Sequence, residues 1–428
     1  MTTRSLSDWL SYLEQLHPSA IDMGLERSRQ VALQMGLSRP APRVITVTGT
    51  NGKGSTCAFV ASLLQAQGLK VGVYSSPHLV RYNERVQIGG VEASDEQLCQ
   101  AFDVVENARG DVSLTYFEVG TLAAFWLFEQ AGLDAVVLEV GLGGRLDAVN
   151  LIDADMALVT SIGVDHVEWL GDNRESVAFE KAGIFREGRP ALCGDPQPPH
   201  TLLDRAAALH CPVSLRGHQF DLSVESDAWH WFGTDAQGHR VELRDLPLLD
   251  LPMQNAALAL QAYLLMDLPW QALTLRTALS DTKVAGRLDR RSIEWQGKQV
   301  HLLLDVGHNP HAASFLKQRL SQRPVTGRRL AVFGLLGDKD LDGVLVELKD
   351  SFSHWAVTPL PTSRSRTAQE IAQALQNLDA DVTSYPSVAL ALEAQTTQAG
   401  AHDEVVVFGS FYCVAEALEW LAGAPRRK

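Results

Sequence analysis

The sequence predicts a two-domain α/β protein in which both domains are built on mostly parallel sheets. Two observations predict this class. Short apolar or β-branched runs alternate with helical patterns of about ten residues or more, which is typical of βαβ units. The chain has 428 residues, and at roughly 150 residues per domain this length allows two or three domains.

The N-terminal segment is expected to form two helices and a strand. Apolar residues at helical spacing from Asp8 to Met35 are interrupted at His17-Pro18, which predicts two helices around a loop that holds Asp22. The β-branched run Val44 to Thr48 then predicts a buried strand. Gly49 opens a glycine loop directly after it.

Helices and strands alternate through the rest of the first domain. The expected elements are helix Thr56–Gln67, strand Lys70–Tyr74, helix Asp95–Ala108, helix Phe117–Gly132, strand Ala135–Val140, strand Met156–Ser161, helix Glu175–Phe185 and strand Pro190–Cys193. Between Val213 and Asp250 short strands alternate with Gly and Asp turns, which predicts a small antiparallel section packed on this domain. Pro252 to Asp281 returns to helix.

A polar stretch, Arg287 to Gln299, carries few core residues and is taken as the interdomain boundary. The expected domains are therefore residues 1–290, with the β-rich section at about 213–250, and residues 291–428. The second domain repeats the alternation and is expected to be Rossmann-like. Its expected elements are strands His301–Asp305, Leu330–Gly334, Trp355–Thr358 and Glu404–Gly409, and helices His311–Ser321, Asp342–Ser351, Ala368–Asn377, Val388–Ala399 and Val414–Leu421.

Composition excludes several classes of protein. The formal charge is 37 − 51 = −14, and a chain without a basic surface is a poor candidate for nucleic-acid binding. Five dispersed cysteines with no C-x-x-C pattern argue against a disulfide scaffold or a zinc site. No stretch is long and apolar enough to span a membrane, and no signal peptide is evident. A cytoplasmic protein is expected.

The glycine loop reads Gly49-Thr50-Asn51-Gly52-Lys53-Gly54-Ser55. Small residues between a strand and a helix let backbone N–H groups face phosphate oxygens, and Lys53 can reach the β and γ oxygens. Gly54 separates Lys53 from Ser55, so the hydroxyl that usually binds Mg²⁺ is displaced and another ligand is required. The loop indicates a P-loop ATPase domain; the alternative is a glycine turn with a solvated lysine.

Two strand ends near this loop offer oxygen ligands for Mg²⁺. Ser76 follows the strand that ends at Tyr74, and Glu139 ends the strand Ala135–Val140. Residues at the carboxyl ends of parallel strands share one edge of the sheet, and Mg²⁺ prefers a few oxygen ligands plus phosphates. A lone carboxylate in an apolar strand otherwise costs free energy to bury. For Ser76 the alternative is that Ser-Pro merely starts a turn.

Three more polar residues are candidates with open alternatives. His166 comes just past a strand, but a lone histidine is more often a surface or core residue than a ligand. Lys181 lies on a predicted helix, in the sequence Glu180-Lys181-Ala182-Gly183. Asp305 ends a strand of the second domain, where it either holds a ribose or a cation or caps the next helix.

Taken together, these segments resemble the folylpolyglutamate synthase family, most closely its bacterial bifunctional dihydrofolate synthase/folylpolyglutamate synthase members. The glycine loop and Glu-Lys-Ala-Gly are shared with the related Mur ligases, whereas Ser-Ser-Pro-His-Leu and Thr-Tyr-Phe-Glu point to the folate branch. The matching stretches run in order through nearly the whole chain: residues 49–55, 74–79, 115–118, 138–150, 165–166, 180–185, 252–260, 286–287, 305–312 and 409–411.

The resemblance implies ATP-dependent formation of an amide or peptide bond to L-glutamate. The carboxylate of dihydropteroate, or the γ-carboxylate of tetrahydrofolate polyglutamates, would attack ATP and become an acyl phosphate, which the glutamate amine then displaces. The implied cofactors are ATP and Mg²⁺, with a monovalent cation such as K⁺ as a further candidate. Small-molecule partners and a monomer are expected.

The resemblance also implies roles for individual positions. Lys181 matches a lysine that is N-carboxylated in the family, and with Lys53 and His166 it forms the implied catalytic set. The other implied sets are ATP contacts at Thr50, Asn51, Gly52, Lys53, Gly54, Ser55, Asn255, Arg287 and Asp305; Mg²⁺ ligands at Ser76, Glu139 and His166; dihydropteroate contacts at Ala20, Ile21, Asp22, Met23, Thr115, Tyr116, Phe117, Glu118, Leu146, Asp147 and Ala148; and weaker glutamate candidates at Arg85, His308 and Ser410.

Three other functions stay open at this point. A monofunctional folylpolyglutamate synthase shares most of the same motifs. A Mur-type muramyl peptide ligase shares the glycine loop. From another class, a P-loop GTPase switch would need an N-K-x-D base-reading motif, and the nearest sequence, Gly337-Asp338-Lys339-Asp340, does not match it.

Overall fold

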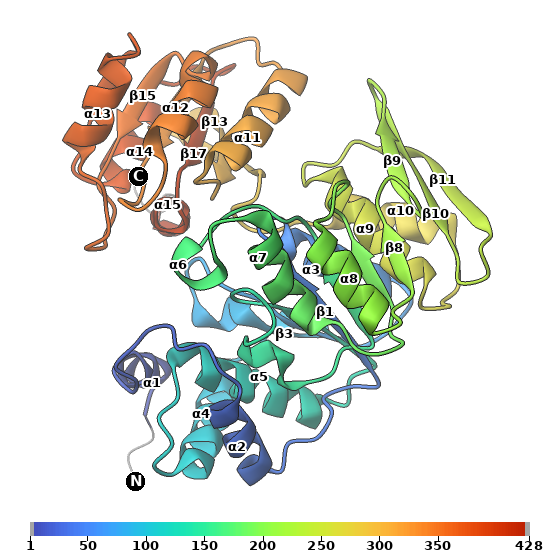
Figure 1. The fold of residues 1–428 in the computed structure, drawn as a ribbon. Helices are drawn as coiled ribbons and strands as arrows, with labels where there is room; N and C mark the ends of the chain where they lie inside the picture. The colour runs from blue at the N-terminus through green and yellow to red at the C-terminus, as the bar shows by residue number, and fades with distance from the viewer. Residues whose placement is uncertain (1–3, 424–428) are drawn as a thin grey trace. The chain divides into compact units, whose positions relative to one another are not determined.

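The computed structural model describes residues 4–423 and divides the chain into two compact units (Figure 1). The larger unit holds the chain up to His78 and Tyr82–Thr282. The smaller unit holds Leu79–Arg81 and the chain from Lys283 onward. Each unit is described by itself below.

The larger unit is built on an eight-stranded sheet whose order is β4-β3-β2-β5-β1-β6-β7-β8. All neighbouring pairs from β2 to β8 are parallel, whereas the pairs β2–β3 and β3–β4 are antiparallel. The strands are β1 (Arg43–Thr48), β2 (Val71–Tyr74), β3 (Val86–Ile88), β4 (Val91–Glu92), β5 (Ala135–Glu139), β6 (Met156–Val159), β7 (Ala191–Cys193) and β8 (Val213–Leu215). Central strands covered on both faces are expected to be almost wholly apolar, and β5 is buried at every position.

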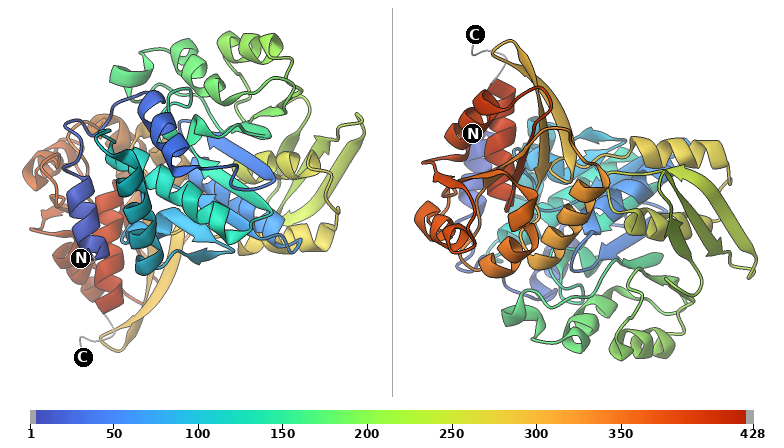
Figure 2. Two further views of the ribbon diagram at one scale, coloured as in Figure 1. Left: turned by 90° about the horizontal axis from the view of Figure 1, so that it is seen from below. Right: turned by 90° about the horizontal axis from the view of Figure 1, so that it is seen from above.

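Helices cover both faces of this sheet. One core packs α1, α2, α4, α5, α7 and α8 against it, while α3 packs with α9 and α10 (Figure 2). The helices are α1 (Leu6–Leu13), α2 (Glu26–Met35), α3 (Lys53–Gln65), α4 (Asp95–Arg109), α5 (Tyr116–Ala131), α6 (Val167–Leu170), α7 (Arg174–Lys181), α8 (His200–Ala208), α9 (Met253–Leu264) and α10 (Ala272–Asp281), with 3₁₀ turns at Tyr82–Arg85, Ala148–Leu151 and Ala182–Ile184.

A small antiparallel sheet lies beside α9 and α10, as Figure 1 shows. It contains β9 (Asp221–Val224), β10 (Ala228–Thr234) and β11 (Arg240–Pro247). Two expectations need correction here. Val213–Leu215 pairs with β7 and belongs to the large sheet, so the antiparallel section begins at Asp221. The expected helix from Pro252 to Asp281 is two helices, because the chain turns at residues 265–267, with Asp267 in a left-handed conformation.

The smaller unit is a six-stranded sheet of order β12-β13-β17-β14-β15-β16 between two apolar cores. α11, α12 and α13 contribute to one core, and α14 and α15 to the other. The elements are β12 (Asp289–Trp295), β13 (Lys298–Asp305), α11 (Pro310–Gln322), β14 (Arg329–Phe333), α12 (Leu341–Leu348), the 3₁₀ turn Lys349–Ser351, β15 (His354–Val357), α13 (Ala368–Gln376), β16 (Val382–Ser384), α14 (Val388–Gln398), β17 (Glu404–Phe408) and α15 (Phe411–Gly423).

The polar stretch Arg287 to Gln299 is a folded part of the smaller unit. Most of it is β12, which pairs antiparallel with β13 along its whole length, from Asp289 to Trp295 (Figure 2). An edge strand of an antiparallel pair can leave one face to solvent and so contains few apolar residues. The domain limits at residues 290 and 291 stay a prediction, and β12 runs across them.

The α/β class with a large parallel sheet, a small β-rich section and a second Rossmann-like sheet is confirmed. None of the helices in residues 4–423 has both the length and the apolar character needed to cross a bilayer.

Candidate functional site

The glycine loop connects β1 to α3, and the helix begins inside the loop, at Lys53. The expected start at Thr56 was therefore too late. Gly52 has φ 89° and ψ −1°, a conformation that L side chains rarely adopt. A Cβ at Gly52 would also lie 2.7 Å from Nδ2 of Asn255 on α9. Glycine is thus required at this position for two independent reasons.

The loop after β6 holds the glycine loop in place through backbone and hydroxyl hydrogen bonds. Thr50 N–H donates to the Ser161 carbonyl at 2.9 Å, and Asn51 N–H donates to Ser161 Oγ at 3.1 Å. In return, Thr160 Oγ1 donates to the Asn51 carbonyl at 2.6 Å. The amine of Lys53 donates to the Gly49 carbonyl at 2.9 Å. These hydrogen bonds hold the glycine loop against the loop after β6.

Glu139 ends β5 next to the first turn of α3. Its side chain is buried and accepts the Ser76 N–H at 3.2 Å, which brings two of the expected metal ligands together. A Cβ at Gly54 would lie 3.6 Å from the Glu139 carboxylate. The Ser55 hydroxyl bonds elsewhere. It donates to the Gly52 carbonyl at 3.1 Å and accepts a hydrogen bond from Asn255 Nδ2 at 2.8 Å.

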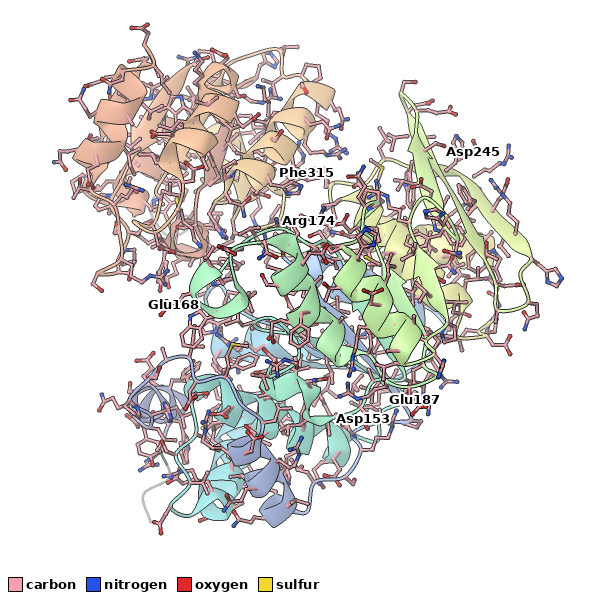
Figure 3. The ribbon with its side chains drawn as sticks, in the orientation of Figure 1. Asp153, Glu168, Arg174, Glu187, Asp245 and Phe315 are labelled. Atoms are coloured by element: carbon pink, nitrogen blue, oxygen red, sulfur yellow. The ribbon has the colours of Figure 1, made fainter. Side chains whose placement is uncertain are left out.

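His166 precedes α6 and has an exposed side chain and a left-handed backbone, with φ 51°. Its N–H donates to Asp165 Oδ1 at 2.8 Å. The loop that leads to it is held at Ile162, whose N–H donates to Asp195 at 3.0 Å and whose carbonyl accepts Arg174 Nε at 2.8 Å. Figure 3 labels Arg174 at the start of α7 and Glu168 on α6.

Lys181 ends α7 and is buried, at 3% exposure. Burial, followed by the positive charge of Lys53, lowers the pKa of Lys181 to about 7, although Asp165 and Asp147 act in the opposite direction. These influences place Lys181 near the lysine of the glycine loop. A substantial share of the amine is therefore neutral near pH 7, and a neutral amine is a nucleophile.

The three segments expected to hold dihydropteroate gather around the loop after β5. A Cβ at Gly141 would lie 2.7 Å from the Phe117 ring and 3.2 Å from the Asp147 carboxylate, and a Cβ at Gly143 would lie 3.6 Å from Met23 Cε. Asp147 is buried and accepts the N–H of Leu142 and Val149 at 2.8 and 3.0 Å. Burial raises the pKa of Asp147 to about 6. Thr115 and Glu118 form the capping box of α5.

Arg85 is buried beside aromatic rings of the same unit. Its Nε donates to His78 Nδ1 at 2.8 Å, and its guanidinium lies 5.3 Å from the Tyr82 ring centre and 5.6 Å from that of Tyr116. Burial and this cation lower the pKa of His78 to about 4. The imidazole is therefore neutral at physiological pH and available as an acceptor for Arg85.

The candidates in the smaller unit include Asp305 at the end of β13 and Ser410 just after β17, and two others lie against the Phe411 ring. Arg287 lies 5.3 Å from the ring centre and the His308 ring 6.4 Å from it. Ser410 Oγ accepts the Cys413 N–H at 3.0 Å. Asp305 is buried and accepts the N–H of Leu288 and Gly307, and burial raises the pKa of its carboxyl while Arg287 lowers it.

Asp305 does not cap the next helix. Asn309 does so, with its side chain accepting the Ala312 N–H at 2.9 Å. That alternative for Asp305 is wrong.

Several residues that build these sites lie outside the predicted sets. Thr48 Oγ1 donates to the Gly143 carbonyl at 2.6 Å, which joins β1 to the loop after β5. The available signal for Thr48 was its place at the end of the β-branched run, directly before the glycine loop. Arg27, in the stretch Ile21 to Arg27, and Phe411, in the matching stretch 409–411, belong to the resemblance, which assigned a role to neither. In residues 4–423 no group of three or more His, Cys, Asp and Glu side chains is placed to hold a metal ion.

The chain is similar to proteins of one family along most of its length. Family models match residues 47–193, "Mur ligase middle domain", and residues 286–411, "Mur ligase, glutamate ligase domain". The "Dihydrofolate synthase/folylpolyglutamate synthase" of Escherichia coli (strain K12) is 47% identical over 414 residues, covering 97% of this chain and 95% of the relative.

Two solved structures are similar over nearly the whole fold. Escherichia coli FolC in complex with DHPP and ADP matches with a TM-score of 0.91 at 46% identity, covering 99% of each chain. A bifunctional folylpolyglutamate synthase/dihydrofolate synthase with Mn, AMPPNP and L-glutamate bound matches with a TM-score of 0.88 at 43% identity, covering 98% of each chain.

Proposed function

The chain belongs to the dihydrofolate synthase/folylpolyglutamate synthase family of Mur ligases, and on that premise we propose how its own residues share the reaction. It is an ATP-dependent ligase that adds L-glutamate to dihydropteroate and to the γ-carboxylate of reduced folates. ATP and a divalent metal are its cofactors. The observation that carries the residue assignment is the buried Glu139, which faces Gly54 at the start of α3.

The reaction needs an activated carboxylate, because a carboxylate is a poor electrophile until one oxygen becomes a leaving group. The substrate carboxylate attacks the γ-phosphorus of ATP, which breaks the bond to the β-γ bridging oxygen and releases ADP. The amine of glutamate then attacks the acyl carbon, phosphate leaves, and the amine loses a proton. Fixed positive charge at the transferring phosphoryl group lowers the barrier of the first step.

The glycine loop is proposed to bind the phosphates of ATP through Thr50, Asn51, Gly52, Lys53, Gly54 and Ser55. Its hydrogen bonds to the loop after β6 hold its backbone in one conformation, and α3 starts directly at its end. The N-terminus of a helix attracts anions. Lys53 adds a cation, and Asn255 supports the loop through Ser55.

The side chains at this edge fit Mg²⁺. Glu139 supplies a buried carboxylate, with Ser76 beside it, and both are hard oxygen donors of the kind that Mg²⁺ takes together with phosphates and water. We assign Ser76, Glu139 and His166 as its ligands. When bound, the ion stabilises negative charge on the phosphate oxygens.

Lys181 is proposed to carry an N-carboxyl group. A neutral amine can add CO₂, and burial beside Lys53 favours the neutral form of Lys181. The carbamate would replace a buried amine by an anion close to the cation of Lys53. Mass spectrometry under native conditions with isotope-labelled bicarbonate tests this, and a Lys181→Arg variant that takes up the same label would contradict it.

The remaining candidates are assigned roles according to the clusters in which the structure places them. Arg287 and Asp305 are proposed as ATP contacts, with His308 and Ser410 as glutamate candidates beside the same Phe411 ring. Arg85 is proposed to meet a substrate carboxylate. The pterin contacts are proposed on the three segments that gather around the loop after β5: Ala20, Ile21, Asp22, Met23, Thr115, Tyr116, Phe117, Glu118, Leu146, Asp147 and Ala148.

We further propose that the enzyme acts as a cytoplasmic monomer on small-molecule substrates, without a nucleic-acid or membrane partner. All five cysteines are free thiols in the structure, which suits a reducing compartment. Size-exclusion chromatography with light scattering measures the oligomeric state.

One assay tests the function. The purified protein is given ATP, Mg²⁺ and radiolabelled glutamate, with dihydropteroate, tetrahydrofolate or a muramyl nucleotide in separate reactions. We expect incorporation with the first two substrates. Incorporation with tetrahydrofolate alone would indicate a monofunctional enzyme, and incorporation only with the muramyl compound would refute the folate assignment.

A further inference from the structure

We propose that Arg27 is a positioning residue for the pterin of the substrate, because it ties the loop that holds Asp22 to helix α5. The inference rests on the proposed function, in which both Asp22 and Glu118 belong to the pterin site. Arg27 itself lies in neither expected segment. It lies on α2, one residue into the helix.

The guanidinium of Arg27 contacts both partners at once. One terminal nitrogen donates to Asp22 Oδ2 at 2.7 Å, and the other donates to the Asp22 carbonyl at 2.8 Å and to Glu118 Oε1 at 3.1 Å. A planar guanidinium can make such a forked set of bonds, whereas a lysine ammonium is a point charge on a flexible stem. The contact therefore specifies the position of Asp22, not only its charge.

Glu118 gives this contact a fixed anchor. Its side chain is 5% exposed. One carboxylate oxygen accepts the Thr115 N–H at 2.7 Å, as part of the capping box of α5, and the other accepts Ser28 Oγ at 3.0 Å. Asp22, in contrast, is 41% exposed. The chain of contacts runs from a rigid helix end to an exposed loop.

The other polar contacts of residues 17–22 are local, and just before them the Leu16 carbonyl accepts Ser113 Oγ at 3.4 Å. His17 Nδ1 contacts the Ser19 carbonyl at 2.9 Å, Ser19 Oγ donates to the Ile21 carbonyl at 2.6 Å, and His17 Nε2 lies 3.5 Å from Asp22. Within residues 4–423, Arg27 is accordingly the polar tie between residues 19–22 and the helices that carry the pterin site. Without it, the loop must be ordered by the substrate on binding, at a cost in affinity.

The contacts of Arg27 with Asp22 and Glu118 are not well suited to stabilising the fold. The Nε–H of Arg27 is buried and has no acceptor among the described residues, and an unsatisfied buried donor is unfavourable. Partly buried ion pairs are in general weak contributors to folding free energy. Placement of the loop accounts for the contact better than stabilisation does.

The test compares Arg27→Met with Arg29→Met in the full-length enzyme. Arg29 lies on the same helix, is exposed, and makes no side-chain hydrogen bond or ion pair within the part of the chain that the structure describes. Steady-state kinetics give kcat and the KM for dihydropteroate, ATP and glutamate, and thermal melting gives Tm. For Arg27→Met we expect the KM for dihydropteroate to rise about tenfold, with kcat and the KM for ATP changed less than about twofold. Arg29→Met should match the parent.

Each possible result supports or overturns the role proposed for Arg27. An unchanged KM for dihydropteroate in folded Arg27→Met overturns the proposal, as does a parallel rise in the KM for ATP with a large fall in Tm, which indicates a general structural defect. If Arg27→Met does not fold, Arg27→Lys keeps the positive charge beside Glu118 but not the fork, and its KM for dihydropteroate should still rise; an unchanged value overturns the proposal. A parent enzyme without dihydropteroate activity would instead refute the proposed function itself, and this inference with it.

Discussion

Gly52 and Asn255 should be coupled in stability, and the coupling can be calculated from their geometry. An alanine at Gly52 adopts a left-handed backbone, at about 1–2 kcal/mol. Its Cβ would lie 2.7 Å from Asn255 Nδ2 and 2.8 Å from Oδ1, so the amide must move and lose its hydrogen bond to Ser55. That bond is worth about 0.5–1.5 kcal/mol. Gly52→Ala should therefore cost about 1.5–3.5 kcal/mol in the free energy of unfolding.

Asn255→Ala alone removes the same hydrogen bond and should cost about 0.5–1.5 kcal/mol. In the double variant nothing is left for the new Cβ to displace, so it should be no less stable than Gly52→Ala alone. The measurement is chemical denaturation of the four proteins as a double-mutant cycle. The reasoning is refuted if the losses of the two single variants sum to the loss of the double variant within about 0.5 kcal/mol.

Gly54→Ala is the matched control for this cycle. It lies two residues further on, inside α3, and its Cβ would meet the Glu139 carboxylate at 3.6 Å, an ordinary contact distance. Replacing a helical glycine by alanine gains about 0.5–1 kcal/mol. We therefore expect no loss of stability in Gly54→Ala, and a loss as large as that of Gly52→Ala would also contradict the argument.

Three further predictions follow from the site. Lys53→Ala should abolish ATP-dependent phosphate release while the circular dichroism spectrum stays that of the parent; full turnover would remove the phosphate-loop assignment. Glu139→Gln, which can still accept the Ser76 N–H, should lower kcat about 10²–10³-fold and raise the Mg²⁺ concentration for half-maximal rate, and an unmoved Mg²⁺ titration argues against Glu139 as a ligand. Burial raises the pKa of Asp147 from 3.8 to about 6, so the folded chain holds this proton more tightly than the unfolded chain. The resulting stability is present below about pH 4 and is lost as pH rises through about 6. Tm should fall over that window more in the parent than in Asp147→Asn, and equal pH profiles would show that Asp147 does not titrate there.

The sequence predicted the strands and helices whose own residues have a clear hydrophobic pattern or a clear boundary. The β-branched run before Gly49 is β1, and the start of α4 at Asp95 matches the expectation. The helix start at Lys53 was missed because glycines at positions 52 and 54 mask it. β12 was missed because an edge strand with one face in solvent contains fewer apolar residues than a buried strand.

The closeness of Ser76 and Glu139 was predictable from the order of the strands. Ser76 follows β2 and Glu139 ends β5, and these are neighbouring parallel strands. The contacts of Arg27 with Asp22 and Glu118 were not predictable, since the last of these residues is 91 positions away along the chain. Such pairings depend on how α2 packs against α5, which no local pattern encodes.

The strand order has a consequence for how the proposed phosphate site is made. β1 lies between β5 and β6, so the contact of Thr50 with Ser161 and that of Glu139 with the start of α3 both join segments far apart in sequence. Pairings of this kind form late and slowly during folding, because long loops must close first. A chain in which β1 has not yet joined both neighbours has no phosphate site. The proposed site therefore requires the completed sheet, and nucleotide bound there would protect that sheet against unfolding by mass action.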